Sequence, residues 1–208
     1  ARRVMSEMSR RANIAEEAEG VLTGGMPLFF SDLRFHPEMY RRAFEAFESG
    51  PMNRYRKTQP AVVANTHLYQ AVLIEAAEGR RSASARYDSA RVQYERIIRL
   101  HPQSAQISRY HIMLGLAYAG LNRKEDAIRE GERAARMAFA SKDAIETYQT
   151  GTLLAEIYMR CGEHEKAIGQ LESVLSTPGD AMAALLRIDP LWEPIRANPR
   201  FRRLLEEN

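Results

Sequence analysis

Few residues in this sequence have the type and spacing that catalysis requires. The stretch His164-Glu165-Lys166-Ala167-Ile168 begins like the helix of a zinc metalloprotease, in which two histidines four residues apart bind the metal. Isoleucine stands where the second histidine is needed, so we do not expect zinc chemistry. Gly24-Gly25 lacks the surrounding glycine, lysine and hydroxyl residues of a nucleotide-binding loop, which favours a plain turn.

The remaining histidines and the single cysteine also favour structural roles. His36, His67, His101 and His111 are scattered, without a carboxylate and a second histidine at helical spacing. Cys161 alone allows no internal disulfide and no multi-cysteine metal site. We expect a packed cysteine there rather than a redox-responsive thiol, in a reducing, cytoplasmic setting. The sequence therefore predicts no catalytic residue, no metal ligand and no cofactor.

Composition excludes several further classes of protein. The 208 residues are 45% hydrophobic and 27% charged, which is ordinary for a globular chain and unlike a disordered or collagen-like one. No run approaches the 18 apolar residues of a membrane span, so we expect no membrane insertion. The chain starts at Ala1 without a signal pattern, and we expect a tag, a leader or another domain upstream of it.

The net charge of +3 argues only weakly for nucleic acid, because phosphate binding needs basic side chains gathered on one face. Two basic clusters, Arg2-Arg3 with Arg10-Arg11 and Arg54-Tyr55-Arg56-Lys57, leave that alternative open. Such clusters are more often solvated surface.

Helical periodicity recurs along most of the chain, and alternating strand patterns are absent. Glycine, proline and asparagine fall between the helical segments, where a helix must stop. The expected helices are Ala61–Glu78, Ala85–Leu100, Ala105–Leu121, Lys124–Met137, Asp143–Cys161, His164–Leu175 and Asn198–Glu206. The predicted fold class is therefore all-α, with antiparallel hairpins joined by short turns.

An internal repeat organises these helices. Leu114, Tyr118, Ala127, Ile128 and Ala134 recur 40 residues later as Leu154, Tyr158, Ala167, Ile168 and Val174. An earlier half-copy places Ala90 37 residues before Ala127. The spacing fits a unit of about 34 residues with insertions of about three and about six, the length of a tetratricopeptide unit.

The residues themselves also resemble the tetratricopeptide repeat family. Leu114-Gly115-Leu116-Ala117-Tyr118, followed by Asn122 and Glu125-Asp126-Ala127-Ile128, is similar to that family's pattern. Leu154, Tyr158, Gly162, Glu165 and Ala167 follow it again, and residues 61–178 carry the resemblance. The resemblance implies a right-handed superhelix of helical hairpins with a concave face.

Elementary packing predicts which positions build this fold. Two antiparallel helices approach closely only through small residues, so Gly115, Ala127, Ala134, Ala155 and Ala167 are expected at the contacts. Asn122 and Gly162 are expected at turns with positive φ.

Both ends of the repeat array should be covered. After Pro178, Asp-Pro and Asn-Pro pairs predict short helices, with Trp192, Ile195 and Phe201 closing the end. This ending also resembles the close of tetratricopeptide regions in bacterial multidomain signalling proteins. Within residues 1–60, helices at 5–19 and 37–48 are expected, as an N-terminal cap or a degenerate repeat.

In this family the first helix of each hairpin lines the concave groove. Matching positions predict nine partner-binding residues: Arg109, Ile112, Met113, Leu116, Gln149, Thr152, Glu156, Met159 and Arg160. Leu116 and Glu156 stand where repeats that grip a terminal carboxylate have asparagine. An apolar or mixed partner segment is therefore expected, unless these side chains pack within the stack.

The sequence thus predicts three parts: an N-terminal helical segment (1–60), three tetratricopeptide-like hairpins (61–178) and C-terminal capping helices (179–208). The expected function is non-catalytic binding of another protein, or of another domain of the parent chain. The alternative is a regulatory domain that binds a small effector or nucleic acid. A homodimer also stays open, because exposed solenoid ends can pair.

Overall fold

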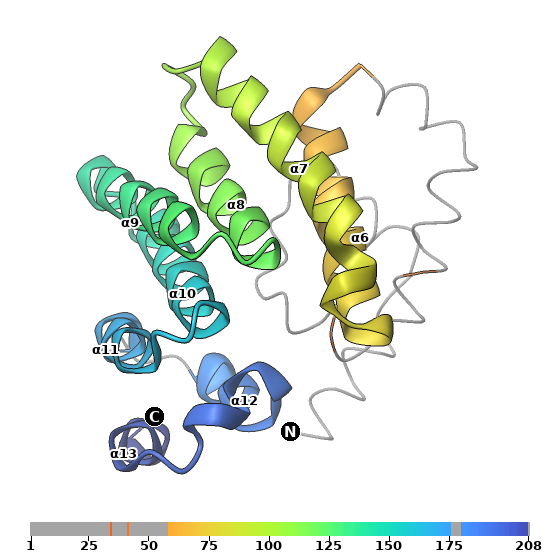
Figure 1. Ribbon diagram of the computed structural model, residues 1–208. Helices are drawn as coiled ribbons and strands as arrows, with labels where there is room; N and C mark the ends of the chain where they lie inside the picture. The colour runs from red at the N-terminus through yellow and green to blue at the C-terminus, as the bar shows by residue number, and fades with distance from the viewer. Residues whose placement is uncertain (1–33, 35–40, 42–57, 176–179, 208) are drawn as a thin grey trace, which may run out of the picture. The chain divides into compact units, whose positions relative to one another are not determined.

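The computed structural model describes Arg34, Arg41 and residues 58–175 and 180–207, and every secondary-structure element in these ranges is a helix. The all-α prediction is confirmed there (Figure 1). No helix of the described ranges is both long and apolar enough to cross a membrane. The elements are α6 (Pro60–Glu78), α7 (Arg80–Leu100), α8 (Ile107–Gly120), α9 (Lys124–Ser141), α10 (Ala144–Arg160), α11 (His164–Leu175), α12 (Asp180–Ile188), the 3-10 helix η1 (Pro190–Ile195) and α13 (Pro199–Glu207).

The chain divides into two compact units, residues 1–93 and 94–208, with the boundary inside α7. The three-part division at residues 60 and 178 stays a prediction. The helices expected at 5–19 and 37–48 lie outside the described residues, apart from Arg41.

In the first unit, α6 and the first part of α7 are joined at Gly79. This glycine has a φ of 89°, which a side chain would disfavour, and its N–H donates to the Glu75 carbonyl to end α6. The Glu75 carboxylate accepts hydrogen bonds from Arg80 Nε, at 2.9 Å, and from the Tyr87 hydroxyl. The Glu75 carboxylate of α6 thus binds two residues of α7, Arg80 and Tyr87.

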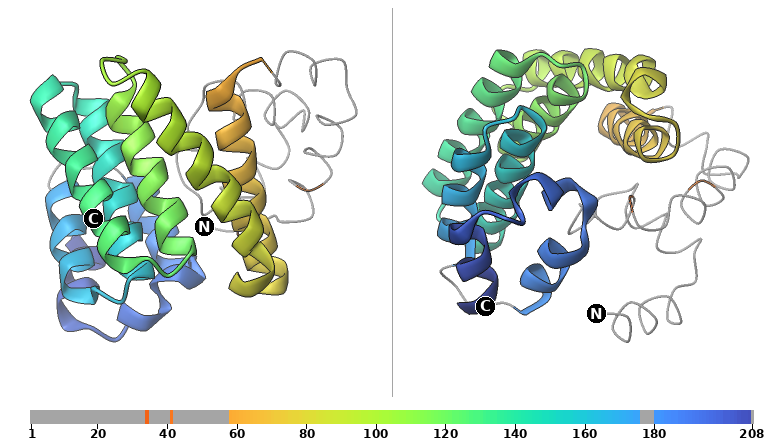
Figure 2. Two further views of the ribbon diagram at one scale, coloured as in Figure 1. Left: turned by 45° about the horizontal axis from the view of Figure 1, so that its top comes forward. Right: turned by 60° about the horizontal axis from the view of Figure 1, so that its bottom comes forward.

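In the second unit, α8 packs on α9, and α10 packs on α8, α9 and α11 (Figures 1 and 2). The turns that follow α8 and α10 contain the two residues expected there, Asn122 with φ 58° and Gly162 with φ 73°. Ala127 and Ala167 are fully buried, as predicted. A Cβ on Gly115 would lie 3.0 Å from the Ala127 carbonyl oxygen, so glycine permits the close approach of α8 and α9.

A hydrogen bond between successive helix pairs recurs with the sequence repeat. Tyr118 Oη on α8 donates to Glu95 of α7 at 2.6 Å, and Tyr158 Oη on α10 donates to Glu132 of α9 at 3.0 Å. Burial and the bond to Glu95 raise the pKa of Tyr118 to about 12, and burial together with Glu132 raises the pKa of Tyr158 as well. Both phenols therefore stay protonated donors.

The C-terminal helices close the end of this array. Asp189 caps η1 by accepting from Leu191 N–H at 3.0 Å, and Asn198 Oδ1 accepts from Arg200 N–H at 2.9 Å at the start of α13. These are the caps predicted from the Asp-Pro and Asn-Pro pairs. The expected closing residues are buried: Trp192, Ile195 and Phe201. η1 contacts α10, and α13 contacts α11.

The end of α11 also shows how the cap replaces a further repeat. Glu172 follows Ala167 by five residues, as Glu132 follows Ala127. Instead of a tyrosine, Arg200 of α13 donates to both Glu172 oxygens, at 3.2 and 2.7 Å, and to Glu165 at 2.8 Å. The capping helix thus binds the carboxylate that a next pair would bind.

Candidate functional site

The nine residues predicted to bind a partner lie on α8 and α10 or at their ends, but most are not exposed. Six of them are at most 6% exposed: Ile112, Met113, Leu116, Thr152, Glu156 and Met159. Residues 111–120 and 150–159 are buried without exception, so both stretches of helix are covered on every face. The structure therefore differs from the expected open groove at these positions, and their role in binding stays a prediction.

The contacts of these residues explain their burial. Ile112 Cδ1 lies 3.8 Å from the position that a Cβ on Gly131 would take, which places it at the contact between α8 and α9. The Thr152 hydroxyl donates to the Tyr148 carbonyl at 2.9 Å within α10. Arg109 and Gln149 are half-buried.

Two of the three charged residues predicted to bind a partner, Glu156 and Arg160, bind each other. Arg160 Nε lies 2.9 Å from Glu156 Oε1, and both side chains are nearly inaccessible. A buried ion pair of this kind is costly to break, because the remaining charge is left without its partner. We therefore expect this pair to hold α10 in shape rather than to meet a ligand as separate charges.

A second buried pair joins α8 to α9. His111 Nδ1 donates to Glu130 Oε2 at 2.7 Å. This hydrogen bond, against the opposing effect of burial, lowers the pKa of Glu130. A carboxylate that orients an imidazole can serve a general base, but the His111 side chain is only 1% exposed and so has no access for a substrate. The pair is therefore structural.

The described residues hold no grouping of three metal-binding side chains from His, Cys, Asp and Glu. Cys161 is half-buried and lies in the turn after α10.

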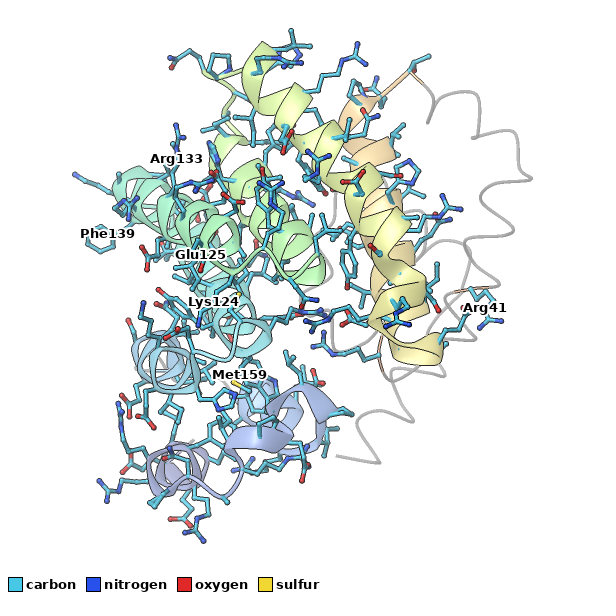
Figure 3. All side chains as sticks on the ribbon, viewed as in Figure 1. Arg41, Lys124, Glu125, Arg133, Phe139 and Met159 are labelled. Atoms are coloured by element: carbon cyan, nitrogen blue, oxygen red, sulfur yellow. The ribbon has the colours of Figure 1, made fainter. Side chains whose placement is uncertain are left out.

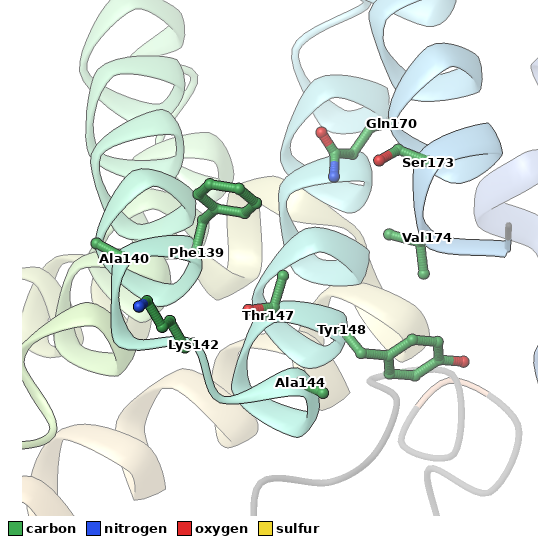
Figure 4. A pocket seen from close by; sticks show the side chains of 9 residues that line it. All are labelled: Phe139, Ala140, Lys142, Ala144, Thr147, Tyr148, Gln170, Ser173 and Val174. Atoms are coloured by element: carbon green, nitrogen blue, oxygen red, sulfur yellow. The ribbon is translucent and has the colours of Figure 1, made fainter. Parts of the chain in front are cut away.

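An open, largely apolar depression of about 510 Å³ lies where α9, α10 and α11 meet. The residues that line it are Phe139, Ala140, Lys142, Ala144, Thr147, Tyr148, Gln170, Ser173 and Val174 (Figure 4). Phe139 is 76% exposed and projects away from the helices at the end of α9 (Figure 3). Ile145, at the start of α10, is 70% exposed. We name this feature the α9 depression.

α9 extends further along the repeat than the described part of α11 does. α9 has 18 residues and α11, its counterpart in the next pair, has 12. The six additional residues carry Phe139 and Ala140 beyond the part of the hairpin that repeats. The interval of 40 residues between Ala127 and Ala167 predicts an insertion of about six residues between the repeats, and such insertions commonly collect on one, often functional, face.

Hydrogen bonds brace the turn that borders the α9 depression. Lys142 ends α9 with a left-handed φ of 60°. Asp143 then caps α10 by accepting from the N–H groups of Ile145 and Glu146, at 2.9 and 3.0 Å. The Ser141 hydroxyl donates to the Ala138 carbonyl at 2.7 Å and lies 2.9 Å from Glu146 Oε2. The exposed side chains are thus presented by an ordered turn.

The opposite wall depends on a glycine. A Cβ on Gly151 of α10 would lie 2.8 Å from Val174 Cγ2 and 3.0 Å from Gln170 Nε2. Without a side chain at this position, both residues of α11 rest directly on α10. Burial raises the pKa of Tyr148, which lines the depression one turn away on the same helix.

Sequence reasoning missed the α9 depression, although a signal was present. The interval of 40 residues between Ala127 and Ala167 exceeds the repeat length by about six residues, which indicates an insertion between the two alanines. Phe139 follows the last apolar position of the repeat pattern and was not considered as a site residue.

Comparison with known proteins adds no assignment: no family model, curated protein sequence or solved structure matches this chain.

Proposed function

We propose that this chain is a non-catalytic protein-interaction module built from tetratricopeptide-like helical hairpins, and that it serves a bacterial signalling or regulatory protein. The resemblance of residues 61–178 to that repeat family supports the proposal, as do the pairs α8–α9 and α10–α11. The parent protein is inferred only from the similarity of the C-terminal ending.

One observation carries the interaction role: an exposed phenylalanine stands at the rim of an apolar depression on an ordered turn. Large aromatic side chains are costly to leave in water and are common anchors of protein interfaces. The α9 depression also falls in the range of about 300–1,000 Å³ that is usual for binding pockets. It is a better-supported contact surface than the buried faces of α8 and α10.

A peptide-display selection tests this proposal. Random 12-residue peptides are selected on the full 208-residue chain and counter-selected on Phe139→Asp, whose fold is checked by circular dichroism. We expect enriched peptides that bind the wild-type chain and perturb amide signals around residues 139–148 and 170–174. Failure to enrich any peptide, or enrichment that the variant retains in full, would contradict the proposal.

A further inference from the structure

The charge that lines the α9 depression is positive only. Among the described residues that line it, Lys142 is the only ionisable group charged at neutral pH. The two carboxylates nearest to it in sequence are already engaged, Asp143 by the N–H groups of α10 and Glu146 by the hydroxyls of Ser108 and Ser141. The Lys142 backbone N–H donates to the Phe139 carbonyl, but its side chain makes no hydrogen bond or ion pair within the described part of the chain, so its ammonium group is available to an incoming anion.

The wall formed by α11 offers a neutral polar group. Gln170 borders the α9 depression, and its carboxamide has no hydrogen-bond partner among the described residues. A carboxamide supplies both a donor and an acceptor, the two functions that a peptide backbone presents in turn. Figure 4 shows Gln170 and Val174 on the side opposite Phe139 and Lys142, with Thr147 between them.

The apolar part of the surface sets the size of the group that fits. Phe139 of α9 and Val174 of α11 supply the larger apolar side chains of its two walls, and Ala140 and Ala144 add only methyl groups. An aromatic or branched aliphatic side chain inserted between these walls would cover the exposed ring of Phe139 and remove its surface from water.

We infer that the α9 depression receives a peptide segment of a partner protein that carries a large apolar side chain beside an acidic residue. The apolar side chain lies against Phe139 and Val174, the carboxylate pairs with Lys142, and the backbone meets Gln170. This assignment rests on the proposed function and adds the chemistry of the partner.

Three fluorescein-labelled 12-residue peptides test the inference by fluorescence anisotropy with the full chain. One has a Glu-Leu-Phe-Glu core, the second a Lys-Leu-Phe-Lys core and the third a Glu-Ala-Ala-Glu core. We expect the first peptide to bind about three- to tenfold more tightly than the second, as expected for one exposed charge pair and its reversal. The third should bind at least tenfold more weakly than the first, because it lacks the apolar anchor.

Variants with matched controls locate the binding. Lys142→Glu should remove the preference for the acidic peptide, whereas Arg133→Glu, an equal charge change at an exposed site of α9, should keep it. Phe139→Ala should weaken binding about tenfold. Leu100→Ala, which shortens another exposed apolar side chain, should leave binding unchanged.

The outcomes separate the two proposals. If the basic peptide binds at Phe139 as tightly as the acidic one, the inferred partner chemistry is wrong and the interaction role stands. If the chain instead self-associates in sedimentation and Phe139→Ala abolishes that association, a second copy occupies the depression and the inference is overturned. If none of the three peptides binds, the inference fails, and the display selection decides separately whether the interaction role fails with it.

Discussion

Two equivalent positions of successive helix pairs carry different residues, and the difference separates structure from recognition. In the α8–α9 pair, His111 and Glu130 form a buried hydrogen bond. Exactly 40 residues later, the α10–α11 pair has Gly151 and Gln170 in their place. The polar contact that closes the first pair is absent from the second, where Gln170 lines the α9 depression instead.

Other features are the same in both pairs. Each has a buried alanine in the first turn of its second helix, a turn with positive φ between its two helices, and a tyrosine whose hydroxyl donates to a glutamate of the preceding helix pair. The repeated residues therefore build the fold, whereas the residues that break the repeat form the candidate binding surface. Such a division is physically reasonable, because a packed contact tolerates little variation and a surface position tolerates much.

Glu130→Ala should have the largest effect on stability. It leaves His111 buried without its partner, and we expect the free energy of unfolding to fall by about 2–3 kcal/mol. The matched change Gln170→Ala, at the equivalent half-buried position, should cost less than about 0.5 kcal/mol. Urea unfolding followed by circular dichroism measures both. Equal losses of unfolding free energy for the two variants would show that Glu130 and Gln170 contribute equally to stability, which would contradict the comparison.

Gly115→Ala should cost about 1–2 kcal/mol, because its Cβ would press on the backbone of α9 at Ala127 and Gly131. Gly151→Ala meets side-chain atoms of Val174 and Gln170 instead of backbone, so the better helix propensity of alanine, about 1 kcal/mol, should offset part of the strain. Gly169→Ala, with no atom within 4 Å, is the unstrained control and should stabilise the chain. A loss for Gly151→Ala as large as for Gly115→Ala would contradict this account.

Tyr118→Phe and Tyr158→Phe should each lower the free energy of unfolding by about 1 kcal/mol, since each removes one hydrogen bond between helix pairs. Similar values for the two variants are expected from their equivalent places in the repeat. Chemical denaturation tests this, and the double variant should show an additive loss. A negligible change in both would mean that these bonds do not hold the pairs in register.

The α8–α9 pair should contribute a pH dependence through Glu130. Because the pKa of Glu130 is lowered from its ordinary value of 4.5, the unfolded chain binds more protons than the folded one near that pH. The stabilisation is complete above that value and is lost as the pH falls through the lower pKa of the folded state. Unfolding measured from about pH 6 to about pH 3 should show this loss, and Glu130→Gln should make the curve shallower. An unchanged slope would exclude Glu130 as its source.

The helices were predictable because periodicity and stop signals agreed. Lys124 and His164 begin their helices as expected, and Asn122 and Gly162 adopt the expected turns. The sequence predicts that α9 ends at Met137, whereas the helix continues for four more residues to Ser141. Beyond it the chain has helix-compatible alanine, phenylalanine and serine, and it stops at a left-handed lysine, a residue type that gives no stop signal.

Exposure was harder to predict than helix position. The groove residues were assigned from their place in a repeat pattern, but burial depends on what packs around a helix, which spacing along the chain does not encode. Glu156 and Arg160 illustrate this limit: their i,i+4 spacing allows the ion pair, but only the structure shows that it is buried.

The fork of Arg200 on Glu165 and Glu172 has a consequence for assembly. Helical arrays risk growing end to end, since their last face resembles the faces buried inside. Here a guanidinium from the same chain binds the carboxylates of both Glu165 and Glu172. Another helix pair that packed on α11 through Glu172 would therefore have to displace this arginine and the α13 helix that carries it.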